Sequence, residues 1–224
     1  MRDSTPAPPP RAASVRLDGR SVDITTRALV VGVLDGAGAS AGAFLANAHE
    51  HVAGGADMLA LTWRASADDV AVLRAEHVLP IAVETDDLEL VRDAFDAGAT
   101  LVRAGAPPTA DYLDAVTVRD GALLVTDPTG DHARLAASCG LDDDQIVLEA
   151  APDCSGDRAL VAALCSVAHS VARNHPVAFT GCDELVAVAW AMQLGARLVY
   201  TRDVAPVARA ARTFAAIAEA GSEQ

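Results

Sequence analysis

The sequence predicts a TIM barrel, an α/β fold of eight (β/α) units in a single domain. From Arg27 to the C-terminus, a short β-branched or apolar run followed by an alanine-rich helical stretch recurs eight times. Eight such units are the number that closes a parallel barrel. The length agrees, because the 224 residues are close to the roughly 250 typical of this fold, and we expect no second domain.

Each unit begins with an expected strand, and five of these runs are apolar without alternation, as in strands covered on both faces. The strands are expected at residues 28–34, 58–62, 79–83, 100–103, 122–126, 145–148, 176–179 and 197–200. The helices are expected at residues 41–52, 68–77, 86–98, 107–116, a stretch ending at residue 140, 158–173, 183–194 and 205–220. Gly54-Gly55, Gly98, Gly140 and Gly195 provide left-handed helix ends before alternate strands.

The N-terminal residues precede the barrel. Residues 1–13, MRDSTPAPPPRAA, are Pro-rich with no apolar core, so we expect a disordered leader rather than a signal peptide. The segment VRLDGRSVDI, residues 15–24, predicts a short hairpin with Asp18-Gly19 in the turn. Such a hairpin can close the bottom of a barrel, and we assign residues 14–224 to the barrel domain.

Charge narrows the range of partners. The 31 acidic residues outnumber the 17 basic ones, and the net charge of −14 disfavours nucleic acid and anionic membrane surfaces. All 17 basic residues are arginine, because the sequence contains no lysine. The absence of lysine excludes mechanisms that need a lysine Schiff base, including those of class I aldolases and pyridoxal phosphate enzymes.

The expected location is the cytoplasm. No run approaches the roughly 20 apolar residues of a membrane span, and the N-terminus has no charged-then-apolar pattern.

The four cysteines, Cys139, Cys154, Cys165 and Cys182, contain no CxxC pair, so we interpret them as reduced. His49 and His51 lie two residues apart on an expected helix and cannot face one metal, so we expect both at the surface.

Six segments at the expected strand ends occur in the order and spacing of a known family. They are VVGVLDGAGAS, GGADMLAL, PIAVETDDLELVRDAFDAGATLV, QIVLEAAPD, HPVAFTGCDEL and GARLVYTRDV. These segments resemble the motifs MGILNVTPDS, GADIIDVGG, PISVDT with AGA, ILDPGIGF, Gly-x-Ser-Arg-Lys and HDV of dihydropteroate synthase and, more broadly, of the pterin-binding barrel superfamily. The resemblance covers nearly the whole barrel, from Arg27 to about Ala220.

The departures from the family fall on residues that, by this resemblance, bind substrate. The asparagine that helps hold magnesium and pyrophosphate corresponds to Asp35, which can still ligate magnesium. The two pterin-recognising aspartates correspond to Glu84 and Glu149, which keep the carboxylate but move it roughly 1 to 1.5 Å. A further pterin contact, an asparagine, corresponds to Arg103. With Arg202, these residues form our candidate pterin-type pocket.

The pyrophosphate-binding positions differ most. The family's Arg-Lys pair at the start of the seventh helix corresponds to Asp183 and Glu184, and the Arg and His of its last strand correspond to Tyr200 and Arg202. Two anions in place of two cations beside a helix N-terminus are expected to abolish diphosphate binding. Asp183 and Glu184 are most simply interpreted as an acidic pair that complements the helix dipole. Arg103 and Arg202 restore anion binding only if they point inward.

Two functions from different classes follow. The first is a dihydropteroate synthase homologue that has lost catalysis and has a binding or regulatory role linked to folate metabolism, with a pterin-like small molecule or a folate-pathway protein as its partner. The second is an enzyme of altered chemistry, metal-assisted or methyl-transferring, that uses Asp35, Glu84 and Glu149. Magnesium at Asp35 is the one cofactor considered, and Asp35 is equally explained as a turn cap. An enclosed pocket with converging carboxylates would favour the enzyme, and a filled or open barrel mouth the inactive homologue.

The last three helices predict a homodimer. The segment LVAVAWAMQL, residues 185–194, is apolar almost all round, whereas an outer helix of a barrel needs only one apolar stripe. The helices before and after it are similarly rich in small apolar residues. Exposing all three would leave a larger apolar patch than monomers usually tolerate. The family resemblance implies the same dimer.

Overall fold

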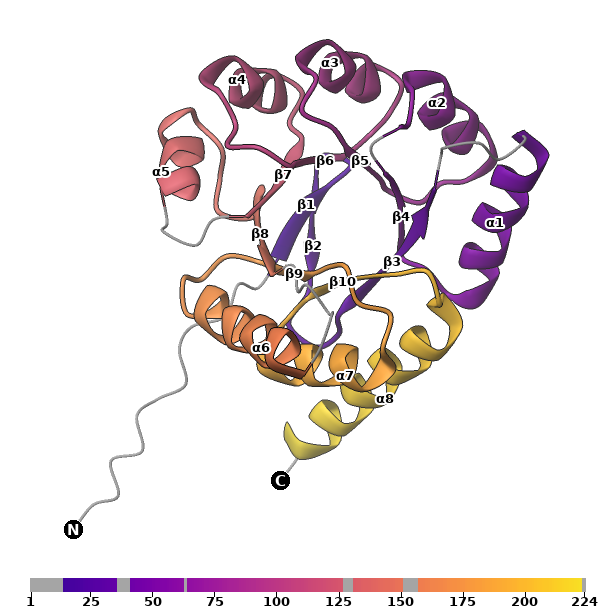
Figure 1. The fold of residues 1–224 in the computed structure, drawn as a ribbon, viewed down its shortest axis with the longest axis vertical. Helices are drawn as coiled ribbons and strands as arrows, with labels where there is room; N and C mark the ends of the chain where they lie inside the picture. Colours follow the sequence, from indigo (N-terminus) through magenta and orange to yellow (C-terminus); the bar gives the residue numbers. More distant parts are fainter. Residues whose placement is uncertain (1–13, 36–40, 63, 127–130, 151–156, 223–224) are drawn as a thin grey trace.

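The computed structural model confirms the closed parallel barrel. It describes residues 14–35, 41–62, 64–126, 131–150 and 157–222, so the leader expected at residues 1–13 lies outside the described residues. The strands close in the order β3-β4-β5-β6-β7-β8-β9-β10, and β10 pairs with β3. Figure 1 shows these strands as a central ring with the helices around it.

The bounds of the elements differ from the expected ones by a few residues at most. The barrel strands are β3 (Leu29–Leu34), β4 (Met58–Leu61), β5 (Ile81–Glu84), β6 (Leu101–Ala104), β7 (Ala122–Val125), β8 (Ile146–Ala150), β9 (Val177–Phe179) and β10 (Leu198–Thr201). The helices are α1 (Ala41–Gly54), α2 (Ala67–Glu76), α3 (Leu88–Asp96), α4 (Ala110–Val118), α5 (Asp131–Ser138), α6 (Asp157–Val171), α7 (Leu185–Leu194) and α8 (Val204–Ser222). Several strands end later than expected, which places Glu84 and Glu149 within strands rather than after them.

Alternation along each strand divides the core in two. In β6, Leu101 belongs to the apolar cluster inside the barrel, and Val102 belongs to the cluster between the strands and the helices. Successive side chains of a strand point to opposite faces, so every second residue enters the interior. Both clusters are buried, and each large apolar side chain contributes about 1.5–3 kcal/mol to folding.

The expected hairpin closes the end of the barrel at which the strands begin. It consists of β1 (Ser14–Leu17) and β2 (Arg20–Asp23), joined by Asp18 and Gly19, both with positive φ, and it crosses the middle of the ring in Figure 1. Its apolar side chains Val15, Leu17 and Ile24 are buried in the interior cluster.

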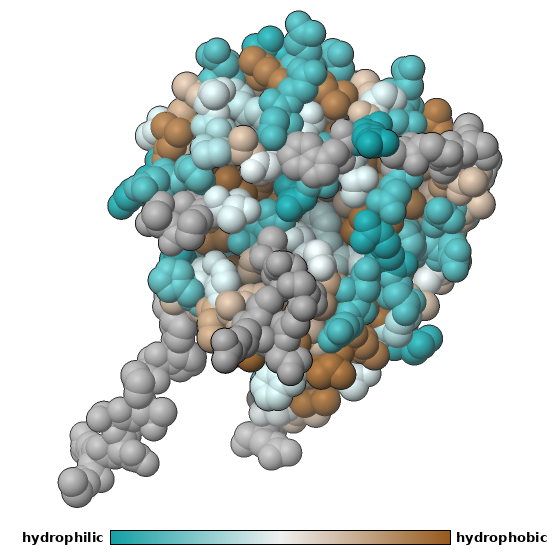
Figure 2. Space-filling model, in the orientation of Figure 1, coloured by the Kyte–Doolittle hydropathy of each residue, from teal (hydrophilic) through white to brown (hydrophobic). Residues whose placement is uncertain are grey.

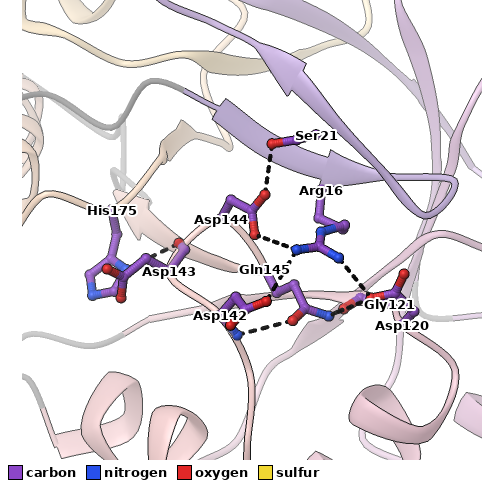
Figure 3. Close-up of polar contacts among 9 residues, drawn as sticks. All are labelled: Arg16, Ser21, Asp120, Gly121, Asp142, Asp143, Asp144, Gln145 and His175. Atoms are coloured by element: carbon purple, nitrogen blue, oxygen red, sulfur yellow. Dashed lines mark hydrogen bonds and ion pairs between the residues drawn. The ribbon is translucent and has the colours of Figure 1, made fainter.

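An arginine of the hairpin fastens it to the barrel. Arg16 donates hydrogen bonds to Asp120 (3.1 Å), Asp142 (3.1 Å) and Asp144 (3.3 Å), which precede β7 and β8 (Figure 3). Its backbone amide donates to the carbonyl oxygen of Asp144 at 2.7 Å, and Ser21 donates to the carboxylate of the same residue at 2.8 Å. The hairpin therefore has a fixed position beneath the interior cluster.

The conformation of the glycines at the helix ends agrees with the prediction from the sequence, whereas the burial of one histidine does not. Gly55, Gly98, Gly140 and Gly195 have φ of 95–114°, the left-handed conformation expected of them. His49 is exposed as expected, but the expectation for His51 was wrong, because this side chain is only 9% exposed and its Nε2 lies 3.0 Å from the carbonyl oxygen of Val33. Among the helices described, none has the length and apolar character needed to cross a membrane.

Candidate functional site

A cavity of about 310 Å³ lies inside the barrel at the end where the strands finish. Its lining comes mainly from β3, β4, β5, β6 and β10 and from the segment after β9. The lining residues are Val33, Ala60, Leu61, Thr62, Ala82, Val83, Glu84, Arg103, Thr180, Gly181, Cys182, Asp183, Tyr200, Thr201 and Arg202. In Figure 2, viewed as in Figure 1, hydrophilic residues gather around the centre of the molecule.

Strand alternation turns the polar residues of this site inward. Ala82, Leu101 and Val147 belong to the interior cluster. Two residues further along the same strands come Glu84, Arg103 and Glu149, on the same face. The interior therefore changes from apolar near the hairpin to charged at the open end.

Arg103 lies between the two glutamates. One of its guanidinium nitrogens pairs with Glu84, and the other lies 2.7 Å from Oε1 of Glu149. Glu149 also accepts hydrogen bonds from Thr126 (2.9 Å) and Thr180 (2.5 Å). Its side chain is 1% exposed, so burial of this carboxylate is compensated by one guanidinium and two hydroxyl groups.

Tyr200 contributes a buried hydroxyl group to the cavity wall. The residue is 7% exposed, and its hydroxyl oxygen has no hydrogen-bond partner among the described residues. Burial raises the pKa of the phenol, and the nearby Glu149 raises it further, while Arg103 acts in the opposite direction. Tyr200 is therefore neutral, and its hydroxyl group can form a hydrogen bond with a ligand in the cavity.

We expect Tyr200→Phe to leave the free energy of unfolding unchanged or to raise it by up to about 1 kcal/mol, because a buried hydroxyl without a partner costs stability. The matched control is Tyr112→Phe, since the Tyr112 hydroxyl donates to the carbonyl oxygen of Thr85 at 2.9 Å. That control should lose about 1 kcal/mol. Urea unfolding of both variants measures the difference. An equal loss in the two variants would show that Tyr200 has a partner.

A second group of charges forms the rim of the cavity. Arg202 donates to both carboxylate oxygens of Asp35 at 3.1 and 3.2 Å, and its third nitrogen lies 3.8 Å from Asp183. Hydrogen bonds from Arg202 lower the pKa of Asp35, its positive charge and a hydrogen bond from Thr62 act in the same direction, and partial burial opposes them. Asp35 is therefore ionised, and its ion pair joins the ends of the neighbouring strands β3 and β10.

Asp183 and Glu184 directly precede α7, which begins at Leu185. Glu184 is the N-cap residue and makes no side-chain capping bond, so its contribution to the helix is that of its charge. Asp183 instead accepts hydrogen bonds from the Thr201 hydroxyl (3.0 Å) and the Arg202 amide (2.8 Å). Its carboxylate is used to hold the end of β10, because the loop after β9 places it beside that strand.

Asp35, the residue considered for magnesium, is engaged in the described part of the site. It forms a bidentate pair with Arg202, which a magnesium ion at this carboxylate would have to displace. Within the described ranges, no group of three or more His, Cys, Asp or Glu side chains is arranged to hold a metal ion.

The five candidate residues lie together at the barrel mouth, in two groups. Arg103, Glu84 and Glu149 form the inner group, and Arg202 and Asp35 form the rim. Both arginines thus point toward acidic partners. Sequence analysis missed Thr180 and the inward orientation of Tyr200. Counting alternate residues along each strand would have placed Tyr200, since Leu198 two residues earlier is interior.

Comparison with known proteins identifies the fold. Neither a protein-family model nor a curated protein matches this chain. Solved structures do match, among them a Yersinia pestis dihydropteroate synthase with a TM-score of 0.79 at 14% identity, over 92% of this chain and 99% of that one. This is the dihydropteroate synthase fold.

Two further structures agree with this assignment. Xanthomonas albilineans dihydropteroate synthase, solved in complex with 7,8-dihydropteroate, has a TM-score of 0.77 at 19% identity over 92% of this chain and 99% of its own. Mycobacterium tuberculosis Rv1207 has a TM-score of 0.76 at 22% identity over 90% and 97% of the two chains. The fold implied by the sequence resemblance is confirmed, and identities of 14–22% establish the fold alone.

Proposed function

We propose that this dihydropteroate synthase-like barrel lacks synthase activity and has a cytoplasmic binding or regulatory role linked to folate metabolism. Its partner is a pterin-like small molecule or a folate-pathway protein. One observation carries the proposal: Arg103 occupies the space between Glu84 and Glu149, the carboxylates that correspond to the family's pterin contacts.

The inner group is ill suited to the family's substrate. A carboxylate grips an amidine through two adjacent N–H donors, which needs both of its oxygens. At Glu149 one oxygen bonds to Thr126, and the other is shared by Arg103 and Thr180. A ligand would therefore have to compete with these protein groups for either oxygen of Glu149. The pocket therefore supports binding of a different geometry from that of the synthases.

The rim is equally ill suited to pyrophosphate. Among the described residues of the rim, Arg202 carries the positive charge, and it is already paired with Asp35 and lies near Asp183. A diphosphate would have to displace two carboxylates from one guanidinium. Coulomb repulsion between the remaining anions opposes this.

The same contacts weigh against the enzyme of altered chemistry. Carboxylates converge in the pocket, as that hypothesis requires, but Glu84 and Glu149 converge on Arg103, and Asp35 pairs with Arg202. Carboxylates held in this way are poor general bases and poor metal ligands. The geometry supports the binding role better than the catalytic one.

Titration calorimetry with pterin tests the binding role. Any pterin affinity of the wild-type chain should fall at least tenfold in Glu84→Ala and Glu149→Ala, because each substitution removes a carboxylate of the inner group and leaves Arg103 without one of its two partners. Glu76→Ala, an exposed substitution on α2, is the control. Unchanged affinity in both pocket variants would place the binding site elsewhere.

We also propose that the chain forms a homodimer through α6, α7 and α8. On α7, Leu185, Val186 and Trp190 are 43%, 69% and 57% exposed. They border a groove of about 480 Å³ against Ala210 and Phe214 of α8, and this groove is almost entirely apolar. Hydrophobic residues also gather over α7 in Figure 2. A second copy presents the same apolar face, so the two faces can cover one another.

Light scattering after gel filtration should give twice the 23.0 kDa mass of the chain at micromolar concentration. Val186→Asp should shift the mass toward the monomer, because it places a charge in the centre of the apolar face. Val118→Asp is the matched control, since Val118 on α4 is 70% exposed and lies outside this face. A wild-type mass near 23.0 kDa would contradict the dimer.

A further inference from the structure

The charges at the cavity do not balance. The inner group has two carboxylates, Glu84 and Glu149, and one guanidinium, Arg103. The rim repeats this ratio with Asp35, Asp183 and Arg202. Among the described residues, each group therefore has one more negative charge than positive. At the inner group this excess is largely shielded from water, because the side chains of Glu84 and Glu149 are only 10% and 1% exposed.

Among the described residues that line the cavity, Arg103 and Arg202 are the positively charged ones, and both are already paired with carboxylates. Arg64, which follows β4, is exposed and is not among the residues that line the cavity. An excess of negative charge in a low-dielectric cavity attracts a cation and repels an anion.

The walls of the cavity favour an organic cation over a bare metal ion. Val33, Ala60 and Ala82 provide an apolar side, and Tyr200 adds a buried hydroxyl without a partner. A hydrated metal ion gains nothing from an apolar wall, and no three-ligand metal cluster is present among the described residues. A molecule with an apolar body and one cationic end matches both the wall and the charge.

We propose that this cavity binds a small organic cation, whose amidinium, guanidinium or ammonium group pairs with Glu84 while its apolar body lies against Val33, Ala60 and Ala82. The proposal rests on the binding role proposed above and adds the charge of the ligand. Arg103 remains in place and orients Glu84. The cation supplies the charge that the inner group lacks, and the Tyr200 hydroxyl can accept a hydrogen bond from it.

Three probes of nearly the same shape and different charge test this proposal. Benzamidinium, benzamide and benzoate are titrated into the wild-type protein by calorimetry at one ionic strength. Benzamidinium should bind at least tenfold more tightly than benzamide, and benzoate more weakly than either. Equal affinities, tighter binding of benzoate, or no binding of benzamidinium at millimolar concentration would overturn the proposal.

Glu84→Gln should lower the benzamidinium affinity about tenfold, to the level of benzamide, because it removes the paired charge and keeps the shape. The control Glu76→Gln removes an equal charge from the exposed end of α2 and should leave the affinity unchanged. Equal effects of the two variants would contradict a site at Glu84. If Glu84→Gln does not fold, the affinities of the wild-type protein for the three probes still test the proposed cation site.

The two proposals fail separately. Turnover in a dihydropteroate synthase assay would overturn the proposed loss of activity and would leave the order of the three affinities as it is. Equal affinities for benzamidinium, benzamide and benzoate would overturn the proposed cation site, and the proposed lack of synthase activity would still stand.

Discussion

The purified protein is expected to condense hydroxymethylpterin pyrophosphate with para-aminobenzoate at least a hundredfold more slowly than an ordinary dihydropteroate synthase. The reaction needs a pocket for the pterin and positive charge for the leaving pyrophosphate. Arg103 fills the space between Glu84 and Glu149, and Arg202 is held by Asp35. A hundredfold loss corresponds to about 2.7 kcal/mol of transition-state stabilisation, which the loss of one or two charged contacts can exceed.

A coupled assay of pyrophosphate release measures this rate. An active dihydropteroate synthase, assayed in the same buffer, shows that substrates and coupling enzymes work. A thermal melt of the sample confirms that the chain under test is folded. Turnover within a hundredfold of the control enzyme would contradict the prediction and, with it, the proposed function.

Removal of the Arg103 side chain should produce the largest loss of stability among single substitutions at the site. Arg103→Ala leaves Glu84 and Glu149 facing each other inside the barrel without the guanidinium between them. Breaking a buried ion pair in this way costs about 3 kcal/mol, toward the lower end of the usual range because the Arg103 side chain is 25% exposed. The midpoint of urea unfolding should fall accordingly.

Two further variants separate the charge effect from lost packing. Adding Glu84→Gln to Arg103→Ala should raise the urea midpoint, because it removes one of the two unpaired carboxylates. Arg119→Ala breaks a bidentate pair with the exposed Asp96 and should shift the midpoint little, since solvent screens surface pairs. If Arg103→Ala shifts the midpoint no more than Arg119→Ala does, the inner group does not stabilise the barrel.

The architecture of this protein could be predicted because its signals are local. The recurrence of strand and helix patterns, and the glycines that end the helices before alternate strands, depend on neighbours within a few residues. Gly98 and Gly195, for example, adopt the expected left-handed conformation with φ of 105° and 114°. The turn at Asp18-Gly19 is another local signal, and it produced the expected hairpin.

The face on which each site residue lies could be predicted from the sequence by counting alternate residues along each strand and past its expected end. β5 was expected to end at residue 83 and β6 at residue 103, whereas the strands end at Glu84 and Ala104. Side chains alternate with a period of two, so the parity of each strand, counted from a known interior residue, decides which side chains enter the barrel. Leu101 supplies that reference for Arg103, and Leu198 supplies it for Tyr200.

The partners of these residues could not be predicted from the chain. Asp35 and Arg202 are 167 positions apart in the sequence and meet because β10 closes the barrel against β3. Arg103 on β6 reaches Glu149 on β8 past the intervening strand β7, and Asp183 bonds to the end of β10. Local patterns thus specify strands, helices and inward faces. Which charges neutralise one another depends on distances that exist only once the eight strands have closed, because Coulomb and hydrogen-bond energies depend on separation in space rather than along the chain.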